Sequence, residues 1–255
     1  MLKILFLGTA ASIPTKERDN TSLLLYTKKE DPLLIDCPGS IVQKLKRLKL
    51  DHTKLTKVII THHHPDHIYG IVSLLHCQFK TTKKITILSS PKSIAILKRL
   101  VRLFGLTGKD YPRIRFVDLL RRKKVTLSKG MTIRAFRNKH CRDSFGVSLG
   151  YKDAHIVYSS DTAPAEKIAS FVNKKTCLIH DCTASSSFFR KYPRMYRMHT
   201  ESSQLKRIAE RLKPRLLIPL HFLLLQKGEL GRIRKELKGV KNIFLPEDGS
   251  SLTLP

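Results

Sequence analysis

The feature that most constrains the fold is a short apolar strand that runs directly into a cluster of histidines. Residues 57–61, "KVIIT", have the composition of a buried strand, and "HHHPDH" follows at once. Binding sites in open α/β sheets lie at the carboxyl ends of strands. The arrangement therefore predicts a metal site at a strand end, and it disfavours a surface loop that is rich in histidine by accident.

An extended backbone would divide this cluster into two faces. His62 and His64 would then point to one side of the chain and His63 to the other, with Asp66 and His67 following directly. Imidazole and carboxylate groups suit zinc or a similar divalent ion. Because so short a backbone cannot easily bring four ligands to one tetrahedral ion, we expect two metal ions.

Three other strand-like segments end in residues of the same types. His140 follows "TIRAF", Asp161 ends "HIVYSSD", and His221 ends "RLLIPLH". Each residue taken alone is better explained as a structural histidine or a turn aspartate. Together with the first cluster, they predict a site assembled from several strand ends.

Strand-like and helical segments alternate along the chain, without a long low-complexity linker. The order predicts an α/β architecture in which helices cover sheets, as a single domain over residues 1–255. The segment "VTLSKGMTIRAFRN" predicts a hairpin, and helices are expected near Ala163 to Asn173 and Glu201 to Leu212.

The chain is strongly basic, with 49 Lys+Arg against 20 Asp+Glu and a net charge of +29. This excess favours a polyanionic partner, nucleic acid first, over a Lys-rich or heat-adapted surface. Clusters such as "KLKRLK", "KRIAERLKPR" and "FFRKYPRMYR" could follow a phosphate backbone. In the last of these, Phe188, Phe189, Tyr192 and Tyr196 could stack on bases beside the metals, or the segment could be a basic amphipathic surface.

Cysteine usage and the N-terminus indicate the compartment. The five cysteines are an odd number without zinc-finger spacing, and "MLKILFLGTAAS" is better explained as a first strand than as an export signal. We therefore expect a cytoplasmic protein, and a homodimer. No apolar run approaches the roughly 20 residues that span a bilayer, so no membrane partner is expected.

The ordered blocks of the sequence resemble the metallo-β-lactamase fold superfamily and, within it, the ribonuclease Z-like phosphodiesterases. The matching blocks are "FLGTAASIPT" with Asn20, "LLIDC", "THHHPDH", His140 ahead of "SFGVSLGY", "YSSDT", "LIHDCT", "MHTESSQLKRIAE" and "LLIPLHF". They cover nearly the whole chain. The resemblance implies a four-layer αββα sandwich.

The resemblance also implies how two zinc ions are held, although manganese or iron would accept the same donors. His62, His64 and His140 would bind one ion, and Asp66, His67 and His221 the other, with Asp161 bridging both. Such a pair of cations lowers the pKa of a shared water, so that metal-bound hydroxide can attack a phosphodiester. Asp66 could accept the proton of that water.

Further residues receive roles from the same resemblance. His199 in "MHTESS" would assist phosphate binding and protonate the leaving group, unless it only begins a helix. Asp181 stands where the ribonuclease Z pattern usually has Glu, and it could orient His199. His63 and His180 are expected to point away from the metals. Cys37 and Cys182 are expected to be core residues rather than nucleophiles.

Two departures from the pattern bear on the substrate. Only "CRDSFGVSLGYKDAHIVYSS" separates His140 from Asp161, so the protruding arm of enzymes that mature transfer RNA is absent, and "DCPGS" replaces a "DCGEG"-like loop. We expect an RNA endonuclease, with precursor transfer RNA as substrate and partner. The alternatives are a phosphodiesterase acting on small or cyclic phosphodiesters, which armless relatives hydrolyse, and a zinc-containing nucleic-acid-binding module without activity, against which the intact ligand set argues.

Overall fold

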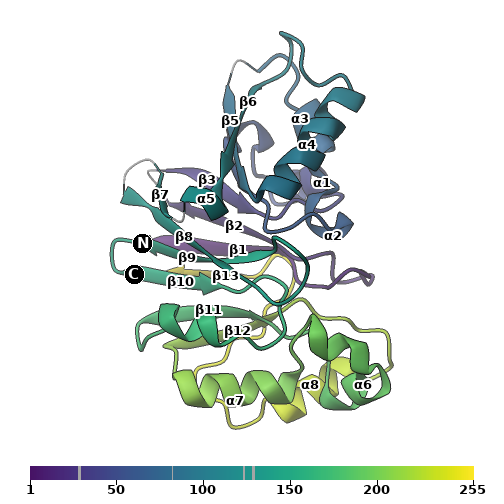
Figure 1. Ribbon diagram of the computed structural model, residues 1–255, viewed down its shortest axis with the longest axis vertical. Coiled ribbons are helices and arrows are strands. Elements are labelled where there is room, and N and C mark those ends of the chain that lie inside the picture. The colour runs from purple at the N-terminus through teal and green to yellow at the C-terminus, as the bar shows by residue number, and fades with distance from the viewer. Residues whose placement is uncertain (28–29, 82, 123, 128–129) are drawn as a thin grey trace.

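Two mixed β-sheets pack face to face, and helices cover the outer face of each sheet (Figure 1). The computed structural model describes residues 1–27, 30–81, 83–122, 124–127 and 130–255. The layers follow the order helix, sheet, sheet, helix. The expected α/β four-layer αββα sandwich is therefore confirmed.

The first sheet has the strand order β13-β1-β2-β3-β4-β5-β6. Its strands are β1 (Leu2–Gly8), β2 (Ser22–Thr27), β3 (Glu30–Ile35), β4 (Lys57–Ile59), β5 (Lys84–Ser89), β6 (Arg113–Asp118) and β13 (Ser251–Leu254). Pairing is antiparallel from β13 to β3 and parallel from β3 to β6. The parallel strands β3 and β4 thus end at the same edge.

The second sheet has the order β12-β11-β10-β9-β8-β7. Its strands are β7 (Lys124–Thr126), β8 (Thr132–Arg137), β9 (Phe145–Tyr151), β10 (Ala154–Tyr158), β11 (Thr176–Asp181) and β12 (Leu216–Leu220). The parallel strands β10, β11 and β12 also end at a common edge. The antiparallel pairing of β7 with β8 confirms the predicted hairpin, although Ser128 and Lys129 of its turn lie outside the described residues.

The helical segments are mostly short. They are α1 (Ile41–Arg47), η1 (His52–Lys54), α2 (Pro65–Ile68), α3 (Ile71–His76), α4 (Pro91–Leu103), α5 (Leu119–Arg122), η3 (Glu166–Phe171), α6 (Ser186–Lys191), η4 (Pro193–Arg197), α7 (Ser202–Leu212) and α8 (Glu229–Glu236). Helices α1, α3 and α4 cover the first sheet, whereas α7 and α8 cover the second (Figure 1). No helix in the described part of the chain is both long and apolar enough to cross a bilayer.

Strand β1 shows why its sequence is apolar throughout rather than alternating. Ile4 and Phe6 pack into the core between the two sheets, whereas Leu5 and Leu7 pack beneath the helices of the first sheet. A strand that is covered on both faces must be apolar on both faces. A third cluster, which includes Leu178 and Leu217, fills the space beneath α7 and α8.

The segment near Ala163 to Asn173 differs from the prediction. It forms the 3-10 helix η3, whose backbone hydrogen bonds join Ile168 to Ala165 and Val172 to Ala169. Proline disfavours helical backbone at the residue before it, so Pro164 delays the start of any helix. The remaining six residues form only a short 3-10 stretch.

Substitution of Gly70 tests how the loop that carries His62 to His67 is attached to the first sheet. Its N–H donates to the Cys37 carbonyl at 2.8 Å, and an added Cβ would lie 1.8 Å from the Pro38 carbonyl oxygen. We expect Gly70→Ala to lower the free energy of unfolding by about 1–3 kcal/mol, because backbone must shift. Urea unfolding measures it. Gly231→Ala is the matched control: it lies within α8 with open space around it, so it should raise stability by about 0.5–1 kcal/mol. Equal effects of the two substitutions would contradict this account.

Candidate metal centre

The structure brings all seven predicted metal ligands together where the strand ends of both sheets meet. His62, His64 and His140 form one group, and Asp66, His67, Asp161 and His221 form a second. In the first group, His64 Nδ1 lies 3.1 Å from His62 Nε2 and 3.0 Å from His140 Nε2. Ligand atoms about 2.0–2.1 Å from one tetrahedral ion lie roughly 3.3 Å apart, so this spacing suits a shared cation.

Asp161 lies between the two groups. Its Oδ1 is 3.4 Å from His67 Nε2, and its Oδ2 is 3.1 Å from His221 Nε2. The same Oδ2 lies 3.8 Å from His62 Nε2 and 3.7 Å from His140 Nε2. The carboxylate is therefore close enough to both groups to be shared by two cations, as the resemblance implied.

Hydrogen bonds turn the histidine rings toward the centre. His67 Nδ1 donates to Asp36 Oδ2 at 2.9 Å, and His140 Nδ1 donates to the Met198 carbonyl at 3.0 Å. His221 Nδ1 lies 3.3 Å from the hydroxyl of Thr21. A ring that uses Nδ1 in this way presents Nε2 as the ligand atom, because such contacts fix the tautomer of metal-binding histidines.

Asp36 is a site residue to which the sequence analysis gave no role. Its Oδ1 accepts hydrogen bonds from the backbone N–H and the hydroxyl of Thr61, at 2.8 and 2.9 Å. Its Oδ2 accepts from His67 and, at 3.2 Å, from the Tyr158 hydroxyl of the second sheet. A sequence signal for Asp36 was present in "LLIDC", where the aspartate directly follows an apolar strand. Asp161 follows its own strand in a similar way, two residues further on.

Backbone strain is concentrated around the same centre. Asp36, Ser160 and His221 have φ values of 60°, 53° and 69° although none is a glycine. Left-handed backbone is costly for such residues and is frequently retained at functional sites. In each case the strained residue lies one or two residues beyond the end of a strand, where it changes the chain direction toward the cluster.

Two buried polar atoms in the centre have no hydrogen-bond partner, and they test whether a metal fits. They are His67 Nε2 and Asp161 Oδ1, which face each other. Burial alone would lower the pKa of His67, but the charges of Asp161, Asp36 and Asp66 outweigh it and raise that pKa well above its usual value. Something positive is needed among these carboxylates, and a divalent cation on nitrogen and oxygen donors meets that need.

The histidines of the first group are suited to be neutral ligands. Burial lowers the pKa of His62 well below its usual value, and burial lowers the pKa of His140 to about 4 despite the nearby Asp161. Metal ligation requires unprotonated imidazole. At neutral pH these rings therefore offer lone pairs without first losing a proton. The residues present fit two cation sites.

His199 lies beside both groups and contacts the predicted partner. Its Nδ1 donates to Asp181 Oδ2 at 2.9 Å, and its ring stacks on His221 with centroids 5.4 Å apart. Asp181 also accepts from Thr162 N–H and the Thr183 hydroxyl, so its carboxylate is fixed. Burial would lower the pKa of His199, but the charge and hydrogen bond of Asp181 raise it overall.

Other residues of the motifs lie outside the seven-ligand set. His180 is fully buried, and its Nδ1 donates to the Asp181 carbonyl. His63 forms a separate group with His64 and Cys141. Cys37 and Cys182 are fully buried, and burial raises the pKa of each thiol well above its usual value, so neither is suited to be a nucleophile.

The structure corrects the interpretation of "FFRKYPRMYR" as a base-stacking segment for its two phenylalanines, whereas Tyr192 is 45% exposed. Phe188 and Phe189 are buried, 3% and 0% exposed, in a cluster with Ala11, Ala184 and Leu223. They anchor the segment and cannot stack on bases. The prediction failed because a six-residue helix, α6, turns both phenylalanines inward, whereas interleaving along the sequence treats all the aromatic residues alike.

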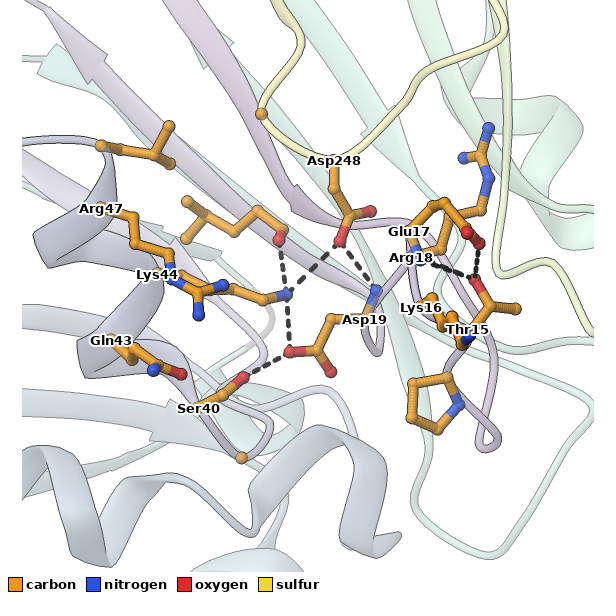
Figure 2. A pocket seen from close by; sticks show the side chains of 15 residues that line it. Thr15, Lys16, Glu17, Arg18, Asp19, Ser40, Gln43, Lys44, Arg47 and Asp248 are labelled. Carbon is orange, nitrogen blue, oxygen red and sulfur yellow. Dashed lines mark hydrogen bonds and ion pairs between the residues drawn. The ribbon is translucent and has the colours of Figure 1, made fainter.

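A cavity of about 590 Å³ is lined in part by Gly39 and Ser40 of the "DCPGS" loop and by none of the seven ligands (Figure 2). Lys44 also lines it, with Nζ 3.0 Å from Asp19 Oδ2 and 3.7 Å from Asp248 Oδ2. Arg18, buried nearby, donates to the Thr9 hydroxyl and to the Pro246 carbonyl. These contacts fix the loop that follows β1, whose Thr9 carbonyl accepts from the backbone next to His221.

Substitution of Asp36 tests its role as a support for the centre. Asp36→Ala leaves Thr61, Tyr158 and His67 with buried donors that lack an acceptor, so the free energy of unfolding of the metal-free protein should fall by about 3–5 kcal/mol. Urea denaturation in the presence of a chelator measures it. Asp153→Ala, at an exposed turn, is the control and should change stability by less than about 0.5 kcal/mol. A loss below 1 kcal/mol for Asp36→Ala would refute this role.

Comparison with known proteins agrees with this geometry. The family described as anti-Pycsar protein Apyc1 matches residues 2–222. A ribonuclease Z from Methanosarcina mazei is 23% identical over 306 aligned positions, which cover 100% of this chain and 99% of the relative. Since this chain has 255 residues, the relative carries stretches without a counterpart here.

Solved structures show the same fold. The metallo-β-lactamase fold protein YhfI from Bacillus subtilis superposes with a TM-score of 0.83 at 21% identity, covering 99% of this chain and 100% of that one. The short form of human tRNase Z gives a TM-score of 0.79 at 21% identity, covering 99% of each chain. The predicted metallo-β-lactamase fold and ribonuclease Z-like resemblance are confirmed, and the chain belongs to the anti-Pycsar protein Apyc1 family.

Proposed function

We propose that this protein is a metal-dependent phosphodiesterase that cleaves RNA, with the 3′ ends of precursor transfer RNA as its target. The observation that carries the proposal is the convergence of two ligand groups on Asp161, with the pair of His199 and Asp181 beside them. Relatives named ribonuclease Z that match the whole chain support RNA as the substrate, as does the net charge of +29.

Two divalent ions would be held by the two groups, one by the three histidines and one by the group that contains Asp66, with Asp161 shared. Zinc suits these nitrogen and oxygen donors, and manganese or iron would also accept them. When bound, such ions supply Lewis-acid chemistry: they lower the pKa of water and polarise phosphate oxygens.

Asp66 is suited to accept a proton from the attacking water. Burial opposes its ionisation, but the charge of His67 and a hydrogen bond to it lower the pKa of Asp66 to about 2. The carboxylate is therefore ionised at neutral pH, and its side chain remains partly accessible, at 11%. An ionised and accessible carboxylate can accept a proton, and its low pKa makes Asp66 a weak base.

His199 is suited to donate a proton to the leaving oxygen of the ester. Asp181 raises the pKa of His199, so the imidazolium form persists to higher pH. Its position beside His140 and His221 places the ring next to both ligand groups. In the imidazolium form, the ring would also neutralise charge on the phosphate. Asp181 acts through His199 and is a positioning residue.

A small or cyclic phosphodiester is the second candidate substrate. β9 and β10 pair closely, with Tyr151 opposite Ala154, so the chain between His140 and Asp161 forms a tight hairpin rather than an arm. A long RNA would have to be held by other parts of the surface, whereas a small ester needs only the centre itself. The hairpin therefore favours this alternative, and the surface charge favours RNA.

Three further expectations are proposals that rest on the sequence. They are a single domain over residues 1–255, a homodimer and a cytoplasmic location. All five cysteines are free thiols, which suits a reducing compartment. Light scattering of the purified protein would test the dimer.

Replacement of one ligand tests the metal centre and the substrate together. His64→Ala should lower the bound metal, measured by mass spectrometry, and reduce turnover more than about 100-fold, because His64 lies at the centre of its group. The substrates are an unprocessed transfer RNA, a cyclic nucleotide and bis(p-nitrophenyl) phosphate. Cleavage of the RNA at its 3′ end by the unaltered protein is the expected result.

The neighbouring His63→Ala is the matched control for that experiment and should keep both metal and activity. Hydrolysis of the small esters alone would overturn the RNA assignment and leave the metal centre standing. Inactivity on all three substrates with metal bound would favour the binding module. Retention of full activity by His64→Ala would refute the assignment of the centre.

The pH profile tests how Asp181 acts. A proton on His199 is the active form, and its raised pKa means that activity is lost only as pH rises through that value. Asp181→Asn removes the charge, so the alkaline limb of kcat/KM should move down by about 1–2 pH units. The measurement uses bis(p-nitrophenyl) phosphate. A variant with lower activity but an unmoved alkaline limb would show that Asp181 is merely structural.

A further inference from the structure

An exposed basic segment lies directly beside the candidate centre. We propose that α6 and η4, residues 186–197, bind the phosphate backbone of an RNA substrate and so take the place of the absent arm. The inference rests on the proposed RNA cleavage. The cations involved are Arg190, Lys191, Arg194 and Arg197, which are all exposed; we call residues 186–197 the basic segment.

The basic segment is fixed to the loops that carry the metal ligands. Phe188 and Phe189 are buried against Ala11 and Leu223, and the latter lies two residues beyond His221. Ring contacts extend the anchor outward, because Phe188 packs on Tyr192 at 4.7 Å and Phe189 on Tyr196 at 5.1 Å between centroids. A surface attached in this way holds its charges at a constant position relative to the centre.

The end of the basic segment contacts the centre itself. The His199 N–H donates to the Met195 carbonyl at 2.9 Å, and the Met198 carbonyl accepts from His140 Nδ1 at 3.0 Å. Arg197 precedes His199 by two residues. The backbone of η4 is therefore joined to the centre, and α6 lies further from His199 along the chain.

The cations of the basic segment have few partners in the fold. Among the described residues, none of the four forms an ion pair; Arg190 donates to the hydroxyl of Ser186, and Lys191 Nζ lies 5.6 Å from the centroid of the Tyr192 ring. The nearby carboxylates have other partners: Glu236 accepts from Ser186 and Ser202, and Glu229 pairs with Arg232. Unpaired cations beside the centre remain available for phosphate groups.

Several cations of the other basic clusters are already paired with carboxylates. On α7, Lys206 lies 4.0 Å from Glu210 and Arg207 lies 3.9 Å from Glu201. On α1, Lys44 is taken by Asp19 and Asp248 (Figure 2). The sequence between Asp181 and Glu201 contains no acidic residue at all. A small ester at the metals would have no use for cations spread over two helical elements, but a chain of phosphates would.

The test replaces two arginines of the basic segment, as Arg194→Gln with Arg197→Gln. Equilibrium binding of a 3′-extended transfer RNA is followed by fluorescence anisotropy from about 50 to 200 mM salt, in the His64→Ala background so that the RNA stays intact. Each phosphate contact that is lost should lower the slope of log Kd against log salt by about 1, and the double variant by about 2. When the same two arginine substitutions are made in the protein that keeps His64, hydrolysis of bis(p-nitrophenyl) phosphate should equal that of the unaltered protein.

The matched control is Arg99→Gln with Arg102→Gln, two exposed arginines on α4. It should leave the slope within experimental error of the parent. A basic segment variant that keeps the parent slope, or a control that loses as much, would overturn the inference while RNA cleavage itself stands. Absence of RNA binding and cleavage by the parent protein would overturn the proposed function and this inference together.

Discussion

The structure depends on how negative charge is buried where the strands of the two sheets end. Asp36 and Asp161 are almost completely enclosed, and Asp66 lies beside them. An enclosed carboxylate is stable only if hydrogen bonds or positive charge compensate for the lost water. Asp36 obtains that compensation from four protein donors, but Asp161 Oδ1 has no hydrogen-bond partner. The difference separates the carboxylate that supports the centre from the one that is left to bind a cation.

The same carboxylates join the two halves of the sandwich. Asp36 belongs to the end of β3 in the first sheet, yet it accepts from Tyr158, the last residue of β10 in the second. A second link runs from the Ser160 hydroxyl to Thr61. The apolar core between the sheets sets their separation, and these polar links set their register at one edge. Ligands from different sheets can therefore lie within hydrogen-bonding distance of one another. A centre built on a single sheet would not need such links between sheets.

The ligands could be predicted because they follow the ends of four strands, and the ends of parallel strands in one sheet share an edge. The same reasoning applied to Asp36, but a single aspartate after a strand has many structural uses, and its partners Thr61 and Tyr158 are distant in sequence. The prediction that Phe188 and Phe189 stack on bases was wrong for another reason. These rings point inward because they pack against Leu223 and Ala11, and no local sequence pattern shows those contacts. The short 3-10 helix η3 likewise reflects Pro164 and the tertiary packing of Ile168. Pairing between distant segments, rather than local propensity, accounts for what the sequence alone did not show.

The loop after β1 is supported from an unexpected direction. Thr21, which contacts His221, lies in a segment fixed by Arg18 on Pro246 and by Asp19 on Asp248. Residues 246–254 follow every metal ligand in the sequence. The support of His221 is therefore completed by a part of the chain that is made after all the ligands. Loss of a few residues around Asp248 would therefore impair the site without removing any ligand.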